Sequence, residues 1–484
     1  MTDGPQLGDG APGPLSGVAG PSGPLSGVAV AVAAGRGAGV SAWLTDVEGR
    51  QVAWFRLAGG KHRGAIGPAE GEVIDRLVCL ALDLGLPIVG ELSTAGADVF
   101  EGIPSLHAWG RVAASLSRAS GALPIILAVV GPCVSGPALL LGLADHVVMT
   151  VDSYAYVSGA QAVADFTGVT TTREALGGAT VHSTVSGVAS LVVQDDDEAR
   201  EAVLDLLSYL PSNYLESPPV TACADPVDRS CRAAAEAVPS RPMASYDMRV
   251  VVGDVVDHES FLEVRAGTAA NVVTGYARLG GVPVGVIANQ PSQKAGTLDI
   301  EAARKAARFV QACDAFGLAL ITFVDSPGFQ PGRDIEWRGM IRHGAQLVHA
   351  YAAATVPRLC VVVRKAYGGA YIVMDSRGLG NDFCVSWPGA EIAVMGAPGA
   401  VAVLHGRRLA EVDDDDDRAR RQAELESEYA ERHCTPAVAA ERGYVDEVID
   451  PHDTRRVLVA GLAALGTKRA SSSRPPARHT NTPL

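Results

Sequence analysis

The chain repeats itself at long range, and this duplication constrains its fold more than any other feature of the sequence. Three pairs of similar phrases recur at separations of 232 to 237 residues: GLPIV from Gly85 and GLALI from Gly317, LPIILAVVGPCVSG from Leu123 and VPRLCVVVRKAYGG from Val356, DHVVM from Asp145 and DFCVSW from Asp382. A nearly constant separation across three phrases indicates that a whole unit is duplicated. We therefore expect two domains of one type, related by a pseudo-twofold axis.

Within each half, short apolar runs alternate with longer helical patterns, which is typical of βαβ crossovers in an α/β fold. GEVIDRLVCLALDLG has helical spacing and ends at Gly85, a plausible C-cap, and a buried strand is expected after Pro87. IEAARKAARFVQACDAFG and LALITFVDSPG repeat this order in the second half. Aromatic residues make up only 5% of the chain, so the cores must rest on Ala, Val, Leu and Ile, which suits buried parallel strands.

The duplication divides the chain into five segments. We expect an N-terminal domain over residues 37–220 and a C-terminal domain over residues 241–467, with a linker rich in Pro, Asp and Ser over residues 221–240. Residues 1–36 and 468–484 are low-complexity segments. Such segments bury too little apolar surface to offset their chain entropy, so we expect both to be disordered.

Charge and motifs exclude several classes of protein. The net charge of −14 argues against nucleic acid as the main partner, and the run Asp413–Asp417 is interpreted as a solvated loop or helix start. Neither a P-loop nor a GxGxxG motif in its required setting is present, so ATP and NAD are not implied.

The cysteines and the apolar runs predict a cytosolic protein. None of the eight cysteines forms a CxxC pair, so we interpret them as reduced core residues, neither metal ligands nor disulfides. The N-terminal residues lack the features of a secretory signal, and no apolar run reaches the length of a membrane span.

Two small-residue turns are the main candidates for chemistry. Residues 131–136 (GPCVSG) and 366–370 (AYGGA) each follow a buried strand and precede a helix. Small residues let a ligand approach the backbone, and the first N–H groups of a helix have no intrahelical partner. Two such donors can hold an oxyanion, and losing one typically costs about 3 kcal/mol. One turn alone is compatible with packing, but its recurrence in both halves favours a functional role.

A second candidate stretch begins at Asp325, where a strand is expected to end, and continues into a helix that carries Arg338, Arg342 and His343. His343 could act as a general base, although a histidine satisfied by packing is the simpler interpretation. No Ser–His–Asp or Cys–His set can be assembled from the spacing.

The second half resembles the C-terminal domain of acyl-CoA carboxylase β subunits of the propionyl-CoA and acetyl-CoA carboxylase type. Matching phrases include VVTGYARLGGVPVGVIANQP, ITFVDSPGFQPG, IRHGAQLVHAYAAATVP, VVRKAYGGAYIVMDS and WPGAEIAVMGAPGAV, and they run nearly unbroken from Tyr246 to Leu458. The first half is similar through EGIPSLHAWGR, GPCVSGPAL, ALGGATVHSTVSGVA and LLSYLPSN, a looser match.

This resemblance implies a carboxyltransferase subunit with a crotonase-like fold in each half. The family forms homo-oligomers, commonly hexamers, with each active site between the N-domain of one subunit and the C-domain of another. The N-domain binds acyl-CoA, and the C-domain binds carboxybiotin, which arrives on a separate carrier together with a biotin carboxylase. The chain lacks the biotin-accepting MKM motif, as expected for this subunit, and no metal is implied.

The resemblance also implies roles for individual residues. Ser135 and Gly136 would face the thioester enolate, and Gly369 and Ala370 would face the ureido carbonyl of biotin. Gly368, Tyr371 and Ile372 would line the substrate pocket, where strict propionyl-CoA enzymes have Asp in place of Ile372, which suggests a different acyl preference. Basic residues that could hold CoA phosphates are Lys61, His62, Arg63 and Lys365, although each alone is more often a surface charge.

The first half departs from the family pattern in three places. The N-terminal helical segment of the family is replaced by the low-complexity stretch, the GGAR phrase is Ala95–Asp98 here, and Pro137 follows Ser135-Gly136 and removes one backbone donor. Two alternatives to a carboxylase therefore stay open. One is a malonyl- or methylmalonyl-CoA decarboxylase or a transcarboxylase, and the other is a catalytically weakened paralogue within a carboxylase complex.

Overall fold

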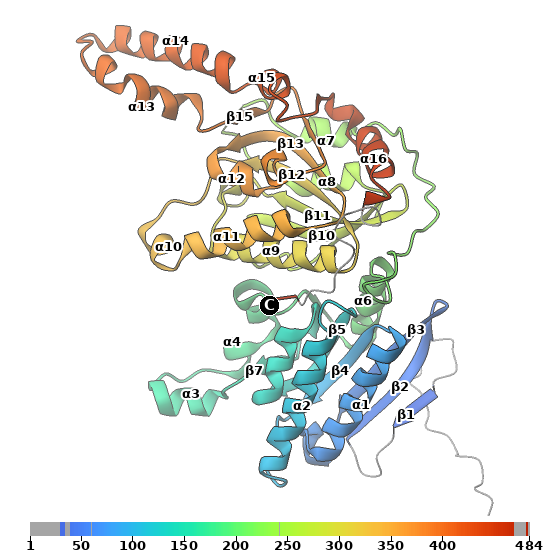
Figure 1. The fold of residues 1–484 in the computed structure, drawn as a ribbon. Coiled ribbons are helices and arrows are strands. Elements are labelled where there is room, and N and C mark those ends of the chain that lie inside the picture. The colour runs from blue at the N-terminus through green and yellow to red at the C-terminus, as the bar shows by residue number, and fades with distance from the viewer. Residues whose placement is uncertain (1–29, 34–38, 60, 242, 469–480, 483–484) are drawn as a thin grey trace, which may run out of the picture.

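The structure is a computed structural model that describes residues 30–33, 39–59, 61–241, 243–468 and 481–482 (Figure 1). Most of the two segments predicted to be disordered lies outside these residues. Within them, Val30–Ala33 forms strand β1, which pairs antiparallel with β2 (Val40–Val47). Near the other end, the backbone N–H of Asn481 donates to the Ser120 hydroxyl at 3.1 Å.

Two eight-stranded sheets repeat the same strand order, which confirms the α/β class. The first runs β1-β2-β3-β4-β5-β6-β8 with β7 beside β5: β3 Arg50–Ala58, β4 Ile88–Thr94, β5 Ile125–Val134, β6 His146–Thr150, β7 Tyr154–Tyr156 and β8 Leu191–Val193. The second runs β9-β10-β11-β12-β13-β14-β16 with β15 beside β13: β9 Leu262–Glu263, β10 Val272–Leu279, β11 Val282–Asn289, β12 Ala319–Ser326, β13 Arg358–Tyr367, β14 Phe383–Ser386, β15 Glu391–Ala393 and β16 Glu447–Val448. β3 to β6 and β11 to β14 are parallel neighbours.

The crossover helices lie where the sequence predicts them, although the first of them begins before the predicted stretch that starts at Gly71. α1 (Pro68–Leu84) starts with proline in its first turn and ends at Gly85, whose φ of 69° is left-handed. α9 (Ile300–Ala315) is capped by the Asp299 carboxylate, which accepts from the Ala302 N–H at 2.9 Å. Gly317, the repeat partner of Gly85, also has a left-handed φ of 73°. The two halves therefore share their turn chemistry as well as their strand order.

The other helices cover the sheets or project from them (Figure 1). In the first half these are α2 Ile103–Ala119, α3 Ala160–Thr167, α4 Arg173–Gly177, α5 Ala179–Val181 and α6 Asp196–Tyr209. In the second half they are α7 Arg232–Ala237, α8 Met248–Val255, α10 Arg333–Trp337, α11 Met340–Ala353, α12 Gly368–Val373, α13 Ala397–Ala410, α14 Asp415–His433, α15 Pro436–Glu441 and α16 Thr454–Ala464. The Asp413–Asp417 run does start a helix, since the Asp414 carboxylate accepts from the Asp417 N–H at 2.8 Å.

A continuous buried core and polar contacts join the two halves. The core includes Val203 of α6 together with Tyr276 and Phe309 of the second half. His146 Nε2 lies 2.8 Å from the Tyr276 hydroxyl, and Arg308 pairs with Asp145 at 3.3 Å. Burial, with smaller contributions from Arg265 and Arg308, lowers the pKa of His146 well below its usual value, so its ring is neutral near neutral pH. Because the two halves share this buried core, it does not mark where one domain ends and the next begins. The predicted domain boundaries therefore stay predictions.

All eight cysteines have free thiols, and six of them are buried as predicted. Cys223 is exposed and Cys79 is half-buried, so these two differ from the expectation of core residues. In the part of the chain that the structure describes, helices long and apolar enough to cross a bilayer are absent.

Candidate functional site

The second small-residue turn joins β13 to α12. Gly368 has a left-handed φ of 59°, and a β-carbon there would lie 3.1 Å from the Val394 carbonyl oxygen, so the turn needs glycine. Gly369 is exposed, whereas Ala370 is fully buried beneath it. The predicted residues therefore form a turn whose outer face is open.

A cavity of about 500 Å³ lies at this turn and brings Gly368, Gly369, Tyr371 and Ile372 together. Half of its remaining wall comes from α14, α15 and the segment after them: Tyr429, His433, Val438, Ala439, Arg442 and Tyr444. The sequence analysis missed this wall. Its only local signal is the helical i, i+4 spacing of Tyr429 and His433, whose rings lie 4.8 Å apart.

Glu391 of β15 braces the turn from the side. The Tyr367 hydroxyl donates to the Glu391 carboxylate, and β15 pairs parallel with β13 from Lys365 to Tyr367. Burial first, and then this carboxylate, raise the pKa of Tyr367. The ring of Tyr367 also packs against Gly396, where a β-carbon would lie 3.4 Å from the ring. The strand end is thereby fixed just before Gly368.

Asp325 is the penultimate residue of β12, one position before the strand ends, and it anchors the neighbouring end of β13. Its carboxylate accepts from Arg364 Nε at 3.0 Å, from the Tyr246 hydroxyl at 2.8 Å and from the Lys365 backbone N–H at 3.1 Å. Burial raises the pKa of Asp325, and Arg364 opposes that rise. Asp325 therefore holds the end of β13 in place and does not line the cavity.

His343 lies on α11 and does not line the cavity at Gly369. Its Nδ1 lies 3.2 Å from the Gln346 side-chain oxygen on the same helix. The ring that does contact the turn belongs to Phe329, 3.4 Å from a β-carbon built on Gly369. The geometry offers no support for His343 as a general base.

The first turn has a different hydrogen-bonding arrangement. Ser135, directly after β5, has φ 65° and ψ −154°, an unusual conformation for a residue other than glycine. Its backbone N–H donates to the Tyr156 carbonyl at 2.9 Å, and Pro137 has no N–H. A β-carbon on Gly136 would lie 2.8 Å from the Trp109 ring. The backbone donor left for a ligand at this turn is therefore the N–H of Gly136.

The loop that carries the AGAD phrase, Ala95–Asp98, packs behind the first turn together with the segment of His62 and Arg63. The Ala95 N–H donates to the Arg63 carbonyl at 3.1 Å, and the Ile66 N–H donates to the Gly96 carbonyl at 2.8 Å. Asp98, the last residue of that phrase, pairs with His62 at 2.7 Å. The structure thus brings His62 and Arg63 to the back of the first turn, while the side chain of Lys61 lies outside the described atoms.

The two turns do not meet within one chain. The cavity at Gly369 is lined entirely by residues of the second half. Large apolar side chains are exposed in both halves: Val99, Phe100, Ile103, Leu106 and Leu139 in the first half, and Trp337, Ile341, Ile372 and Val394 in the second, of which Ile372 and Val394 line the cavity at Gly369.

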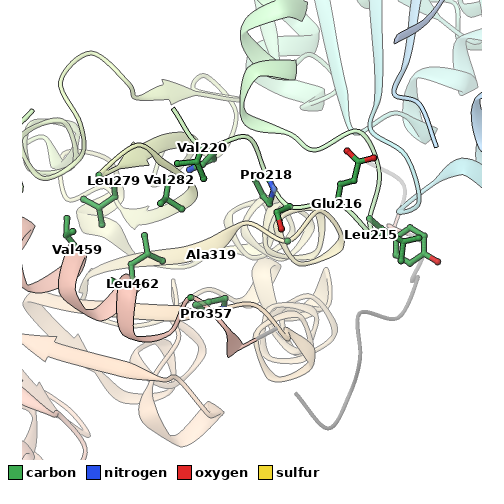
Figure 2. A pocket seen from close by; sticks show the side chains of 17 residues that line it. Leu215, Glu216, Pro218, Val220, Leu279, Val282, Ala319, Pro357, Val459 and Leu462 are labelled. Atoms are coloured by element: carbon green, nitrogen blue, oxygen red, sulfur yellow. The ribbon is translucent and has the colours of Figure 1, made fainter. Parts of the chain in front are cut away.

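A separate cavity of about 530 Å³ lies elsewhere (Figure 2). Leu215, Glu216, Pro218 and Val220 form one side of it, and Leu279, Val282, Val459 and Leu462 form another. None of the predicted site residues lines this cavity, so it is not part of the site at the turns.

Comparison with known proteins identifies the class. A family model for the carboxyl transferase domain matches residues 26–481, so the chain belongs to the carboxyl transferase family. It is 43% identical over 449 residues to the propionyl-CoA carboxylase carboxyltransferase subunit of Haloferax mediterranei, covering 93% of this chain and 86% of that protein. It is 38% identical over 449 residues to the methylmalonyl-CoA decarboxylase subunit alpha of Veillonella parvula, with the same coverage of 93% and 86%.

A crystal structure of transcarboxylase 12S with methylmalonyl-coenzyme A and methylmalonic acid bound has a TM-score of 0.86 and 39% identity to this chain. The match covers 92% of this chain and 85% of the other. This likeness confirms the crotonase-like α/β fold in both halves, and the family resemblance drawn from the sequence is confirmed with it.

Proposed function

We propose that this chain is the carboxyltransferase subunit of a biotin-dependent acyl-CoA carboxylase. It transfers a carboxyl group from carboxybiotin, held on a separate carrier, to the α-carbon of a short-chain acyl-CoA. The observation that carries this proposal is the duplicated device: each half ends a buried strand in a turn of small residues with backbone donors, and carboxyl transfer involves two carbonyl oxygens. Positioning and electrostatic stabilisation then supply most of the catalysis.

The cavity at Gly369 fits the biotin side of the reaction. Its volume of about 500 Å³ and its walls of Tyr371, Ile372 and Tyr429 suit a compact bicyclic ring. The N–H of the exposed Gly369 would hold the ureido oxygen, since the first N–H groups of α12 have no partner inside that helix, whereas Ala370 is fully buried and would lie behind it. Biotin supplies the carboxyl group when bound.

The first turn would hold the thioester oxygen. The Gly136 N–H is the donor available there, because the Ser135 N–H is used by Tyr156. His62 and Arg63 would lie toward the CoA phosphates, and the pairing of His62 with Asp98 reduces the positive charge on that side. One donor and a weaker phosphate site predict looser CoA binding than in relatives with two glycines and an arginine.

A second copy of the chain would complete each site. Both halves expose large apolar side chains, among them Phe100 and Leu139 in the first half and Trp337 and Ile372 in the second, and exposed apolar surface is typical of protein interfaces. Docking the first half of one subunit on the second half of another brings both turns together. The transcarboxylase 12S structure, which is described as a hexamer assembly, supports an oligomer of this kind. Further partners would be a biotin carboxylase and its carrier, and the free thiols support a cytoplasmic location.

The test uses the purified full chain with free biotin and either malonyl-CoA or methylmalonyl-CoA. We expect acetyl-CoA or propionyl-CoA to form only when biotin is present, because biotin must accept the carboxyl group. Release of CO2 without biotin would contradict the proposal.

Two alternatives make different predictions. The similarity to the methylmalonyl-CoA decarboxylase subunit favours the reverse direction, in which the carboxyl group moves from the acyl-CoA to biotin. Loss of CO2 from a biotinylated carrier would reveal this direction. The Ser135 N–H is already hydrogen-bonded to Tyr156, and Pro137 has no N–H to donate. This loss of backbone donors favours a catalytically weakened paralogue. That protein would show no acyl-CoA binding by calorimetry while still co-purifying with an active β subunit.

A further inference from the structure

The chain is poor in lysine, and nearly every described lysine amine is occupied. Its five lysines are Lys61, Lys294, Lys305, Lys365 and Lys468. Lys294 pairs with Asp299 at 2.6 Å, Lys468 pairs with Asp382 at 2.6 Å, and Lys305 donates to three backbone carbonyls. Apart from Lys61, whose side chain is not described, Lys365 alone has an amine with no hydrogen bond or ion pair to the described residues.

Lys365 lines a cavity of about 250 Å³ on one face of β13. The walls come from β13, β14–β15 and the predicted linker: Ala235, Val238, Pro239, Ser240, Val363, Arg364, Trp387, Gly389, Glu391 and Pro451. Lys365 precedes Tyr367 by two residues, so both side chains leave the same face of the strand. The amine is therefore half-buried close to the second turn, in a space large enough for a small acyl group.

The surroundings of this amine favour its neutral form, which is the nucleophilic one. Burial and then Arg364 lower the pKa of Lys365, while Asp325 and Glu391 act in the opposite direction. Both carboxylates are engaged elsewhere, Asp325 with Arg364 and Glu391 with the Tyr367 hydroxyl. A lysine that is partly desolvated beside another cation is a known way to obtain a nucleophilic amine.

We propose that Lys365 is a self-acylation site for short-chain acyl thioesters. The Nζ atom attacks the thioester carbonyl carbon, a C–N bond forms as the C–S bond breaks, and the proton lost from nitrogen ends on the departing thiol. The expected donor is acyl-CoA, and for that donor alone the inference rests on the proposed function. The product is a neutral amide beside Arg364.

Acylation of Lys365 would disturb the second turn. The amide removes a positive charge next to Arg364 and places an acyl group beside Glu391, which holds Tyr367 and the strand end before Gly368. Excess acyl-CoA would thereby slow carboxyl transfer in proportion to the fraction of Lys365 modified.

The experiment incubates the full chain with propionyl-CoA and, separately, with S-propionyl-N-acetylcysteamine, a thioester without CoA. Peptide mass spectrometry follows modification at each lysine. We expect Lys365 to react at least tenfold faster than Lys294 and Lys468 with both donors. Lys365→Arg should abolish this fast phase, and Lys294→Arg, the matched control at an exposed ion-paired lysine, should leave it unchanged.

A second variant tests the electrostatic basis. The charged groups that act on the amine are Arg364, Asp325 and Glu391. Glu391→Gln keeps a hydrogen-bond acceptor for Tyr367 and removes one of the two carboxylates that raise the pKa of Lys365. We expect a several-fold faster reaction at neutral pH and a rate–pH profile displaced to lower pH.

Equal rates at Lys294, Lys365 and Lys468, or a Glu391→Gln variant that reacts no faster, would overturn the inference. Fast reaction of Lys365 with the CoA-free thioester but not with propionyl-CoA would support the reactive amine and overturn acyl-CoA as its donor, while the biotin-dependent transfer assay decides the proposed function independently. The two proposals can therefore fail separately.

Discussion

Gly96 lies directly against Ser135, so that a β-carbon on Gly96 would stand 2.8 Å from the Ser135 β-carbon and 3.1 Å from the Val134 carbonyl oxygen. Gly96 also has a positive φ of 104°. The loop that carries the altered AGAD phrase therefore sets the position of the first turn, and this loop in turn binds the segment of His62 and Arg63.

Gly96→Ala should displace the Ser135 turn, because the added β-carbon would clash with the Ser135 β-carbon and the Val134 carbonyl oxygen. The positive φ of this residue is also a conformation that alanine rarely adopts. We expect carboxyl transfer to fall at least tenfold while the far-ultraviolet circular dichroism stays unchanged. Gly253→Ala in α8, where a β-carbon would meet nothing within 4 Å, is the matched control and should retain activity. Equal activity of both variants would argue against a role for this turn.

The two glycines of the second turn should respond differently to alanine. Gly368 has a left-handed φ and its β-carbon would lie 3.1 Å from the Val394 carbonyl oxygen, whereas Gly369 would make only an ordinary 3.4 Å contact with Phe329. We expect Gly368→Ala to lower kcat for biotin-dependent transfer by more than tenfold and Gly369→Ala by much less. Steady-state kinetics with free biotin would check this order.

Asp375 predicts a specific pH dependence of stability. It pairs with Arg358 at 3.0 Å, and burial raises its pKa to about 6, with Arg358 opposing the rise. Because the folded pKa exceeds the usual value near 3.8, this group favours folding most at low pH and loses about 3 kcal/mol of that contribution as the pH rises from about 4 to 6.

Asp375→Asn removes this titration, and its neutral amide resembles the protonated carboxyl group of the wild-type chain, so the free energy of unfolding of the wild-type chain minus that of the variant should be largest near pH 4. The stability gap to the wild-type chain should shrink between pH 4 and 6 and stay constant above pH 6. Urea denaturation at pH 4.5, 5.5 and 7.5 would measure the gap, and a gap that widens with pH would contradict the assignment.

Tyr276 should contribute to the seam between the two halves. Tyr276→Phe removes the hydroxyl that lies 2.8 Å from His146 Nε2 and leaves a buried ring nitrogen without that partner. We expect a loss of about 1–3 kcal/mol in the free energy of unfolding. Tyr444→Phe, at a tyrosine that is 57% exposed, should change the free energy of unfolding little.

Ile341 tests the proposed assembly. It is 82% exposed on α11, in the same half as the second turn. Ile341→Glu would place a charge in the proposed interface, so light scattering should show smaller oligomers with an unchanged fold. Val250→Glu on α8 introduces the same charge at another exposed apolar position and should leave the oligomer intact.

Some features of the site followed from local chemistry that the sequence displays. Gly85 and Gly317 end their helices because only glycine adopts the left-handed conformation there at little cost, and Asp414 caps α14 through its own side chain. The second turn was likewise predictable, because glycines that follow a buried strand directly mark a turn in the sequence. The Ser135 N–H was not, because its acceptor, Tyr156, belongs to a neighbouring strand.

The sequence by itself determined the duplication, the α/β class of both halves, the two turns and the family, because each depends on residue patterns that repeat or lie within one segment. Only the tertiary structure decided that His62 pairs with Asp98, that Trp109 packs on Gly136, that Tyr429 to Tyr444 wall the cavity at Gly369, and that Lys365 keeps a free amine. These relations join residues far apart in the chain, and their distances arise from how the strands and helices pack.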